Sequence, residues 1–299
     1  MHAGWRIGWV GVRDLSPETR RVVILTHGDA EVASAALKET LAFFAERGVE
    51  VLAPQTEWEK HRGILDGPTP VTAVTGSSEL GGVGLCVVLG GDGTMLRAFH
   101  LTRDLSIPVA GVNLGRVGFL TTIAKEELSG GLSRLLAGEF TEYPLLGLKA
   151  EVNSETYRAT NDVVVSKGDR SRACSLALTI NGVTLFEVLC DGVVVGTPAG
   201  SSAYSLAAGG PLLGISVDAY VISLVAAHAV GVRPVVAAPM DVLEIISTDD
   251  TDCYLDVDGQ RMLVLSPGSV VRIKTSPGMT SLALLKGDSL YHHFRDRLL

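Results

Sequence analysis

The chain has 299 residues, of which 46% are hydrophobic and 19% are charged, and this composition excludes intrinsic disorder because it can bury a substantial core. The net charge of -8 and the aromatic content of 5% argue against a nucleic-acid partner, which requires a basic face or a base-stacking platform. At roughly 150 residues per domain, the length predicts one large domain or two ordinary ones.

Hydropathy and cysteine usage favour a cytoplasmic protein without a membrane partner. The longest apolar stretch, residues 219–238, is interrupted by His228, Arg233 and Pro234, so it lacks the clean run of about 20 apolar residues that a spanning helix needs. The N-terminus has neither a signal-peptide nor a transit-peptide pattern. No HExxH motif accompanies the seven histidines, and we expect no zinc site. The cysteines form no CxxC pair and are expected to be buried and reduced; they are Cys86, Cys174, Cys190 and Cys253.

The first half of the chain predicts an α/β domain. Residues 21–27 have the β-branched composition of a buried strand, residues 31–47 place apolar side chains at helical spacing, and residues 49–53 form the next strand. Such a βαβ unit favours a parallel sheet. Residues 57–84 are polar and rich in glycine, proline, serine and threonine, and they predict a long loop with room for one helical turn. The remaining elements are strands at 85–89 and 107–112 and helices from Met95 and over 125–137.

The second half predicts an all-β domain. Short β-type runs recur about every eight to twelve residues from Leu145 to Leu285, and Asn181-Gly182 and Asp258-Gly259 are typical centres of type I′ hairpins. Helical spacing occurs near residues 201–208 and in the amphipathic tail. The predicted organisation is an extension at 1–20, an α/β domain with a parallel, Rossmann-like sheet at 21–143, an all-β domain at 144–286, and a C-terminal helix at 287–299 that packs back on the first domain.

A glycine-rich segment, Gly90-Gly-Asp-Gly-Thr94, follows an apolar strand and opens a helix. Glycines in this position let backbone N–H groups approach a phosphate, and the helix N-terminus adds a favourable dipole. Because Asp92 would repel a phosphate, it suits either magnesium handling or general-base activation of a hydroxyl for phosphoryl transfer. A tight turn in which Asp92 caps the helix is an equally good interpretation of this motif alone. No P-loop motif is present, and no GxGxxG follows the first strand.

Two segments of the second half carry further candidate contacts. Residues 191–211 run from an apolar strand through a Pro-Ala-Gly turn to serines that can cap a short helix, and their small side chains leave room for a flat ligand. The pair Asn161-Asp162 precedes a valine-rich strand and can receive ribose hydroxyls or an adenine amino group. A capped helix start and a plain loop are the alternative interpretations of these two segments.

Taken together, GGDGT, the Asn-Asp pair and TPAGSSAYS resemble, in order and spacing, the bacterial-type NAD kinase (ATP-NAD kinase) family from residue 21 to the C-terminus. Residues 111–120, GVNLGRVGFL, resemble the family's GxNxGxxGFL stretch. GGDGT alone is shared with phosphofructokinases and with diacylglycerol and sphingosine kinases, whereas TPxGSxAYS is far more specific. The resemblance implies phosphorylation of the 2′-hydroxyl of the adenosine ribose of NAD by ATP or another phosphoryl donor. It also implies a divalent cation, expected to be Mg²⁺, and a homo-oligomer, either a dimer or a tetramer.

The resemblance assigns roles to particular residues. Asp92 falls on the family's general base, and Gly93 and Arg97 fall on neighbouring nucleotide contacts. Asp191 matches a residue that can be contributed across a subunit interface. The other nucleotide-contacting positions are Asn161, Asp162, Arg172, Ser202, Ala203, Tyr204, Ser205 and Gln260.

The chain departs from the family pattern at two places. Leu189 stands where the RxDG motif has arginine, and His228-Ala-Val-Gly231 lacks two hydroxyls of the usual segment before Arg233-Pro234. Two alternatives to an NAD kinase stay open. One is a lipid kinase that shares GGDGT, which the acidic composition and TPAGSSAYS disfavour. The other is a non-catalytic nucleotide-sensing homologue, which the departures favour and an intact Asp92 disfavours.

Overall fold

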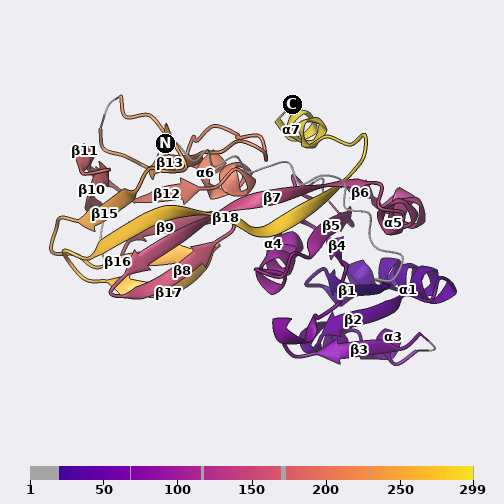
Figure 1. Ribbon diagram of the computed structural model, residues 1–299. Coiled ribbons are helices and arrows are strands. Elements are labelled where there is room, and N and C mark those ends of the chain that lie inside the picture. Colours follow the sequence, from indigo (N-terminus) through magenta and orange to yellow (C-terminus); the bar gives the residue numbers. More distant parts are fainter. Residues whose placement is uncertain (1–19, 68, 116–117, 170–172, 230, 299) are drawn as a thin grey trace, which may run out of the picture. The chain divides into compact units, whose positions relative to one another are not determined.

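A computed structural model describes residues 20–67, 69–115, 118–169, 173–229 and 231–298 (Figure 1). The chain divides into two compact units. The first unit comprises the chain up to Pro144 together with residues 280–299, and the second comprises Leu145–Met279. The predicted extension up to residue 19 and the predicted contact Arg172 lie outside the described residues.

The first unit is built on a parallel sheet in the order β5-β4-β1-β2-β3, with β6 beside β5. Both alternating sets of side chains on β4 are buried, which is the pattern of a parallel sheet covered on both faces. This architecture confirms the predicted α/β class. The strands are β1 (Arg21–Thr26), β2 (Glu50–Pro54), β3 (Val71–Val74), β4 (Leu85–Gly90), β5 (Pro108–Asn113) and β6 (Ile123–Ala124).

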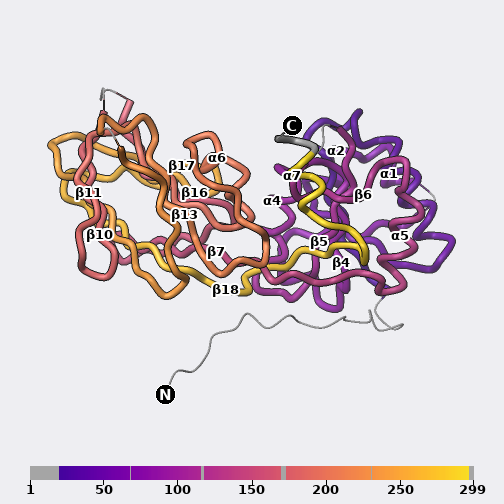
Figure 2. Tube along the Cα trace, turned by 90° about the horizontal axis from the view of Figure 1, so that it is seen from above, coloured from indigo at the N-terminus to yellow at the C-terminus, as the bar shows by residue number. Residues whose placement is uncertain are grey.

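Local signals set the helices of this unit. The longest helix, α1 (Ala30–Glu46), begins where Asp29 Oδ1 accepts the Glu31 N–H at 2.9 Å, and it is followed by Gly48, whose φ of +62° ends the helical path. The apolar face of α1 packs in one core cluster with α5 (Leu128–Leu136). The last helix, α7 (Leu290–Leu298, yellow in Figure 2), packs within the first unit, where the ring of Phe294 meets that of Phe119 edge to face. The predicted C-terminal helix is therefore confirmed.

The predicted long loop over residues 57–84 is wrong. This segment contains most of α2 (Gln55–Lys60), and also α3 (Arg62–Leu65), β3 and a 3₁₀ turn, η1 (Ser77–Glu79). Strand β3 extends the sheet by pairing with β2 at the register Val51–Val71. Its four residues are too few to display a strand period. The two helices have only six and four residues, which is too short to be stable without tertiary packing.

The second unit consists of antiparallel sheets. One sheet has the order β14-β13-β12-β9-β16-β17, and a second group has the order β11-β10-β15-β18, with β7 pairing with β18 and β8. The strands are β7 (Phe140–Val152), β8 (Glu155–Ala159), β9 (Asp162–Lys167), β10 (Cys174–Ile180), β11 (Val183–Cys190), β12 (Gly192–Gly196), β13 (Tyr220–Val225), β14 (Val235–Ala237), β15 (Leu243–Ser247), β16 (Cys253–Val257), β17 (Gln260–Leu265) and β18 (Val270–Leu285).

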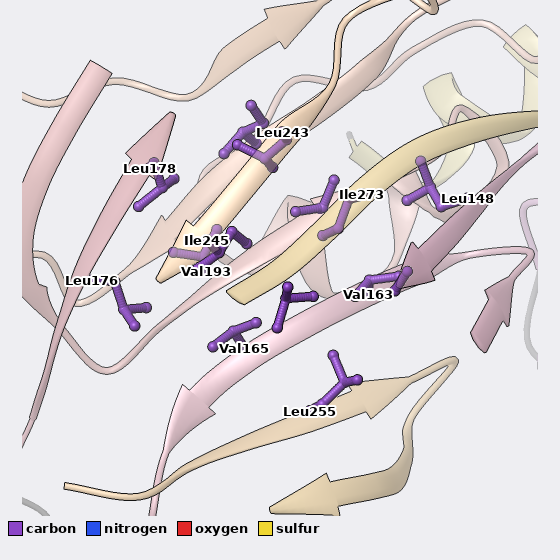
Figure 3. Close-up of a cluster of buried hydrophobic side chains, with 14 of the residues drawn as sticks. Leu148, Val163, Val165, Leu176, Leu178, Val193, Leu243, Ile245, Leu255 and Ile273 are labelled. Atoms are coloured by element: carbon purple, nitrogen blue, oxygen red, sulfur yellow. The ribbon is translucent and has the colours of Figure 1, made fainter. Parts of the chain in front are cut away.

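A single apolar core joins these sheets. Figure 3 shows Leu176, Leu243 and Ile273 from one group of strands beside Val163, Val193 and Leu255 from the other. All four cysteines are free and buried, which confirms the prediction, and three of them belong to this core. Both predicted hairpin turns are confirmed, because Asn181-Gly182 and Asp258-Gly259 have positive φ throughout and join paired strands.

The longest strand, β18, takes part in both units. Its residues 270–273 pair with β15, whereas Ser281 and Leu282 pair in parallel with β5. The compact second unit therefore ends at Met279, seven residues before the end of the predicted all-β domain (279 against 286). Within the described ranges, no helix is long and apolar enough to cross a membrane.

Candidate active site

Asp92 is the first residue of α4 (Asp92–Leu101), directly after the buried strand β4. Its Oδ2 accepts the backbone N–H of Phe119 at 2.8 Å, and its Oδ1 accepts that of Leu120 at 3.0 Å. The N-cap position belongs to Gly91, and no side chain caps this helix. The interpretation of Asp92 as a helix cap is therefore wrong: its carboxylate is oriented by the backbone of the GFL segment instead.

Glycines allow the GFL segment to lie close to the Asp92 carboxylate. A methyl group on Gly118 would overlap Asp92 Oδ1 and lie 2.6 Å from Thr121 Oγ1, and one on Gly90 would lie 2.9 Å from Thr94 Cβ. The GGDGT and GFL segments are thus packed against each other through positions without a Cβ. The backbone around Gly93 is exposed and has open space beside it, so it is free to face a ligand.

Arg97 is anchored on a buried carboxylate. Its Nη2 forms an ion pair with Glu57 Oε1, and its Nη1 donates to the Thr26 carbonyl at 3.3 Å. Glu57 Oε2 also binds Lys60 Nζ at 2.8 Å and accepts from Thr26 Oγ1 at 2.6 Å. Burial raises the pKa of Glu57, but the hydrogen bonds from Lys60, Thr26 and Arg97 outweigh burial and keep that pKa below its ordinary value.

This network holds the positively charged side chains of Lys60 and Arg97 at the carboxyl end of β1. Ligands of open parallel sheets commonly bind at this edge. Sequence reasoning missed Glu57 and Lys60 because both fall in the segment predicted as a loop. The i, i+3 spacing of the two residues was an available signal, since such pairs share one face of a helix.

In the second unit, the structure brings together two of the predicted segments. The Thr197 N–H donates to the Asn161 carbonyl at 2.9 Å, and Thr197 Oγ1 donates to the Thr160 carbonyl at 2.6 Å. A methyl group on Gly200, in the turn η3 (Ala199–Ser202), would lie 2.6 Å from Asn161 Cα. The Asn-Asp pair and the TPAGS turn therefore touch backbone to backbone.

Two side-chain oxygens in this cluster have no hydrogen-bond partner among the described residues. They are Asn161 Oδ1 and Thr160 Oγ1, and both are buried. A buried acceptor without a donor costs about 1–3 kcal/mol. A ligand hydroxyl or amino group that donates to Asn161 Oδ1 would remove this penalty.

Asp258 closes the same cluster from the β16–β17 hairpin. Its carboxylate accepts backbone N–H groups from Thr160, Asn161 and Asp162, with shortest distances of 2.8, 2.7 and 3.1 Å. Asp162 itself is 6% exposed, and burial, followed by the neighbouring Asp258 charge, raises the pKa of Asp162 to about 7. Sequence reasoning missed Asp258, because a DG turn shows only the hairpin and not where its carboxylate points.

The raised pKa of Asp162 predicts a pH dependence of stability. In the folded state Asp162 binds its proton up to about pH 7, so its contribution to stability is full below the unfolded-state pKa near 3.8 and is lost as the pH rises to 7. We expect the free energy of unfolding of Asp162→Asn, relative to the unsubstituted protein, to increase by about 2–4 kcal/mol between pH 4 and pH 8. Urea unfolding across this range measures the difference, and a pH-independent difference contradicts the prediction.

The predicted contacts after η3 differ in accessibility. The helix α6 (Tyr204–Ala207) starts with Tyr204, which is 44% exposed and follows the exposed Ala203, whereas Ser202 is half-buried. Ser205 is fully buried, and its Oγ lies within hydrogen-bond distance of Ser223 Oγ, at 3.1 Å. This hydroxyl therefore links α6 to β13. Gln260 is exposed and follows the Asp258-Gly259 turn directly.

Asp191 is not part of this cluster. It lies at the opposite end of β12 from Gly196, which pairs with Asp162, and five strand residues span roughly 16 Å. Its carboxylate binds Lys167 Nζ at 2.8 Å.

The two departures from the family pattern, at Leu189 and at the segment that begins with His228, are neighbours in the structure. The His228 N–H donates to the Leu189 carbonyl at 2.8 Å.

Known proteins resemble this chain over most of its length. The ATP-NAD kinase N-terminal domain family matches residues 23–140, and the ATP-NAD kinase C-terminal domain family matches residues 160–285. The NAD kinase of Aromatoleum aromaticum is 34% identical over 287 residues, covering 93% of both chains. That of Geobacter sulfurreducens is 32% identical over 270 residues, covering 87% of this chain and 91% of the relative.

Solved structures share the fold. Yeast NADH kinase complexed with NADH superposes with a TM-score of 0.82 at 21% identity, covering 93% of this chain and 87% of that one. An NAD kinase from Archaeoglobus fulgidus in complex with ATP superposes with a TM-score of 0.66 at 22% identity, covering 93% and 97%. The architecture is thus that of the NAD and NADH kinases. With its two matched domains and its relatives above 30% identity, the chain belongs to the NAD kinase family.

Proposed function

We propose that this chain transfers the γ-phosphoryl group of ATP to the 2′-hydroxyl of the adenosine ribose of NAD, giving NADP and ADP. Family membership supports the enzyme class. The observation that carries the reaction is Asp92, a carboxylate oriented by two backbone N–H groups at the start of a helix and beside an exposed glycine backbone.

The chemistry requires a base because the pKa of a ribose hydroxyl lies far above 7. As the 2′-oxygen forms its bond to the γ-phosphorus, its proton passes to Asp92, and the bond from the γ-phosphorus to the bridging oxygen breaks to release ADP. Each Asp92 oxygen uses one lone pair on a backbone donor, so each keeps another for the proton. Arg97 and Lys60, fixed by Glu57, supply positive charge for the phosphates.

The second unit is proposed to bind the nucleotide. Asn161 Oδ1 needs a donor, and Asp162 is held beside it, which suits ribose hydroxyls or an amino group. Asp191, at the far end of β12, is proposed to serve a neighbouring subunit. The other proposed contacts are Gly93, Arg172, Ser202, Ala203, Tyr204, Ser205 and Gln260.

Magnesium is proposed to arrive with the substrate as MgATP, in which it neutralises phosphate charge. Within the described ranges, no group of three or more histidine, cysteine, aspartate or glutamate side chains is arranged to hold a metal ion. The residue roles proposed above do not depend on a resident cation.

A homo-oligomer, dimer or tetramer, in the cytoplasm is part of the proposal. Edge strand β11 exposes Val183, Leu185 and Leu189 on one face, and an apolar sheet edge of this kind favours pairing with a second copy. Sedimentation tests this part, and a monomer at micromolar concentration contradicts it.

Tyr204→Ala is expected to weaken NAD binding more than it slows turnover. An exposed aromatic ring at the start of α6 is free to stack on a base or on the nicotinamide, and loss of such a stack costs about 1–3 kcal/mol. Steady-state kinetics should show KM for NAD raised about 10-fold with kcat within a few-fold. Lower thermal stability with unchanged KM would show that Tyr204 is a packing residue.

The proposed reaction is tested by a coupled assay of NADP formation from ATP and NAD, with NADP-dependent glucose-6-phosphate dehydrogenase as the reporter. We expect turnover that requires both ATP and NAD. Binding of NAD without any NADP formation would refute the proposed reaction.

A further inference from the structure

We propose that Asp258 is a positioning residue for nucleotide binding: its carboxylate fixes the Thr160–Asp162 segment and so sets the orientation of Asn161 and Asp162. This inference rests on the proposed function, which makes these two residues NAD contacts. The family resemblance assigns no role to Asp258. In this hairpin it assigns a nucleotide contact only to Gln260.

The first observation is the set of donors. Three consecutive backbone N–H groups, those of Thr160, Asn161 and Asp162, converge on one carboxylate that is itself 8% exposed. Consecutive N–H groups of this kind form an anion-binding concavity, and here the anion is a side chain of the protein. Hydrogen bonds to an ionised acceptor are about twice as strong as neutral ones, so this segment is held firmly.

The second observation is that Asn161 is held from both sides. Asp258 accepts its N–H at 2.7 Å, and Thr197 donates to its carbonyl at 2.9 Å. The Asp258 N–H also donates to the Asp162 carbonyl at 3.0 Å. The backbone of the Asn-Asp pair therefore has its polar groups tied to the hairpin and to the TPAGS turn, whereas Asn161 Oδ1 has no hydrogen-bond partner among the described residues.

The third observation is that the hairpin turn alone does not require an aspartate at this position. Asp258 has φ of +49°, and the turn requires only a residue that tolerates this conformation. Asparagine tolerates it as well as aspartate does. The turn therefore does not explain the negative charge, whereas the carboxylate accepts the N–H groups of Thr160, Asn161 and Asp162.

The charge of Asp258 also acts on Asp162. The strand partner of Asp162 on β12, Gly196, is uncharged, and Thr160 and Thr197 beside it are neutral. Asp258 is the charged side chain that raises the pKa of Asp162, in addition to burial. If NAD affinity depends on the charge of Asp162, the pH dependence of that affinity should therefore change when Asp258 is replaced.

The test is Asp258→Asn, which keeps the turn and removes the charge. We expect Kd for NAD, measured by calorimetry, and KM for NAD to rise about 10-fold, with kcat within about three-fold. In the unsubstituted protein we expect NAD affinity to change near pH 7, where Asp162 titrates. In Asp258→Asn this change should move to lower pH but persist, because Asp162 remains buried. In Asp162→Asn this transition should disappear.

The matched control is Asp256→Asn on the same hairpin. The Asp256 carboxylate binds Arg261 Nε at 3.2 Å and is not among the acceptors of the Thr160–Asp162 segment, so NAD affinity should be unchanged. If Asp258→Asn does not fold, Asp258→Glu takes its place: it keeps the charge but displaces the carboxylate, so Kd should rise while the pH transition stays near 7.

Two results would overturn the inference. One is a lower melting temperature with unchanged Kd for NAD and an unchanged pH transition, which is the behaviour of a purely structural residue. The other is an unchanged Kd in Asp258→Glu. Failure of the proposed function is distinguishable, because the unsubstituted protein would then form no NADP even where calorimetry still detects NAD binding.

Discussion

Replacement of Asp92 by asparagine is expected to lower kcat by about 10²–10⁴-fold, because it removes the oxygen that takes the proton of the ribose hydroxyl. Affinity for NAD should stay within a few-fold, since the contacts proposed for the nucleotide lie on other residues. Initial-rate kinetics at saturating ATP, together with calorimetric binding of NAD, measure the two effects separately.

The structure adds a geometric component to this loss. Both Asp92 oxygens accept backbone N–H groups, so the amide nitrogen of asparagine would face the N–H of Phe119 or Leu120, donor against donor. We therefore expect the melting temperature to fall by a few degrees as well. Asparagine in place of an aspartate that merely caps a helix would have no such effect.

The matched control for Asp92→Asn is Asp29→Asn. Asp29 caps α1 through the Glu31 N–H, a role that asparagine fills equally well, so activity and stability should both survive. Full activity of Asp92→Asn at ordinary magnesium would end the general-base hypothesis. Partial rescue by raised magnesium would instead indicate that Asp92 handles the cation.

Gly200→Ala is expected to raise KM for NAD more than 10-fold and to lower the free energy of unfolding by about 1–3 kcal/mol. The added methyl would overlap the backbone of Asn161, with 2.6 Å to its Cα, and backbone cannot move aside as a flexible side chain can. Either η3 or the Asn161-Asp162 segment must therefore shift. Urea unfolding and the kinetics of NADP formation measure the two effects.

The control for Gly200→Ala is Gly76→Ala, in the first unit. An added methyl at Gly76 meets no atom within 4 Å, and its φ of -166° is open to any residue, so neither stability nor KM should change beyond error. Unchanged KM for NAD in Gly200→Ala would show that the contact between the TPAGS turn and Asn161 has no part in binding.

Sequence patterns were sufficient where a signal is local. The apolar run before Gly90, the helical spacing over residues 31–47 and the two Asn-Gly and Asp-Gly turns each report their own backbone conformation, and together they predict the α/β and all-β halves. The motifs predicted the family in the same way, because GGDGT and TPAGSSAYS are contiguous segments.

What remained hidden were features whose energy comes from distant partners. Strand β3 forms by pairing with β2, and the last residues of β18 join the first sheet beside β5, although neither fact leaves a mark on local periodicity. Glu57 forms ion pairs with Lys60 and Arg97. The pair with Arg97 requires the folded chain to place β1 and α4 beside Glu57.

The orientation of carboxylates shows this division most clearly. The sequence alone determined that Asp92 and Asp258 sit at a glycine-rich helix start and in a hairpin turn, respectively. Only the tertiary structure decided that Asp92 is held by Phe119 and Leu120 rather than capping its helix, and that Asp258 binds residues nearly a hundred positions earlier in the chain. The physical reason is that a carboxylate's hydrogen-bond partners are chosen by proximity in the folded chain, and a loop of that length leaves no local trace of its closure.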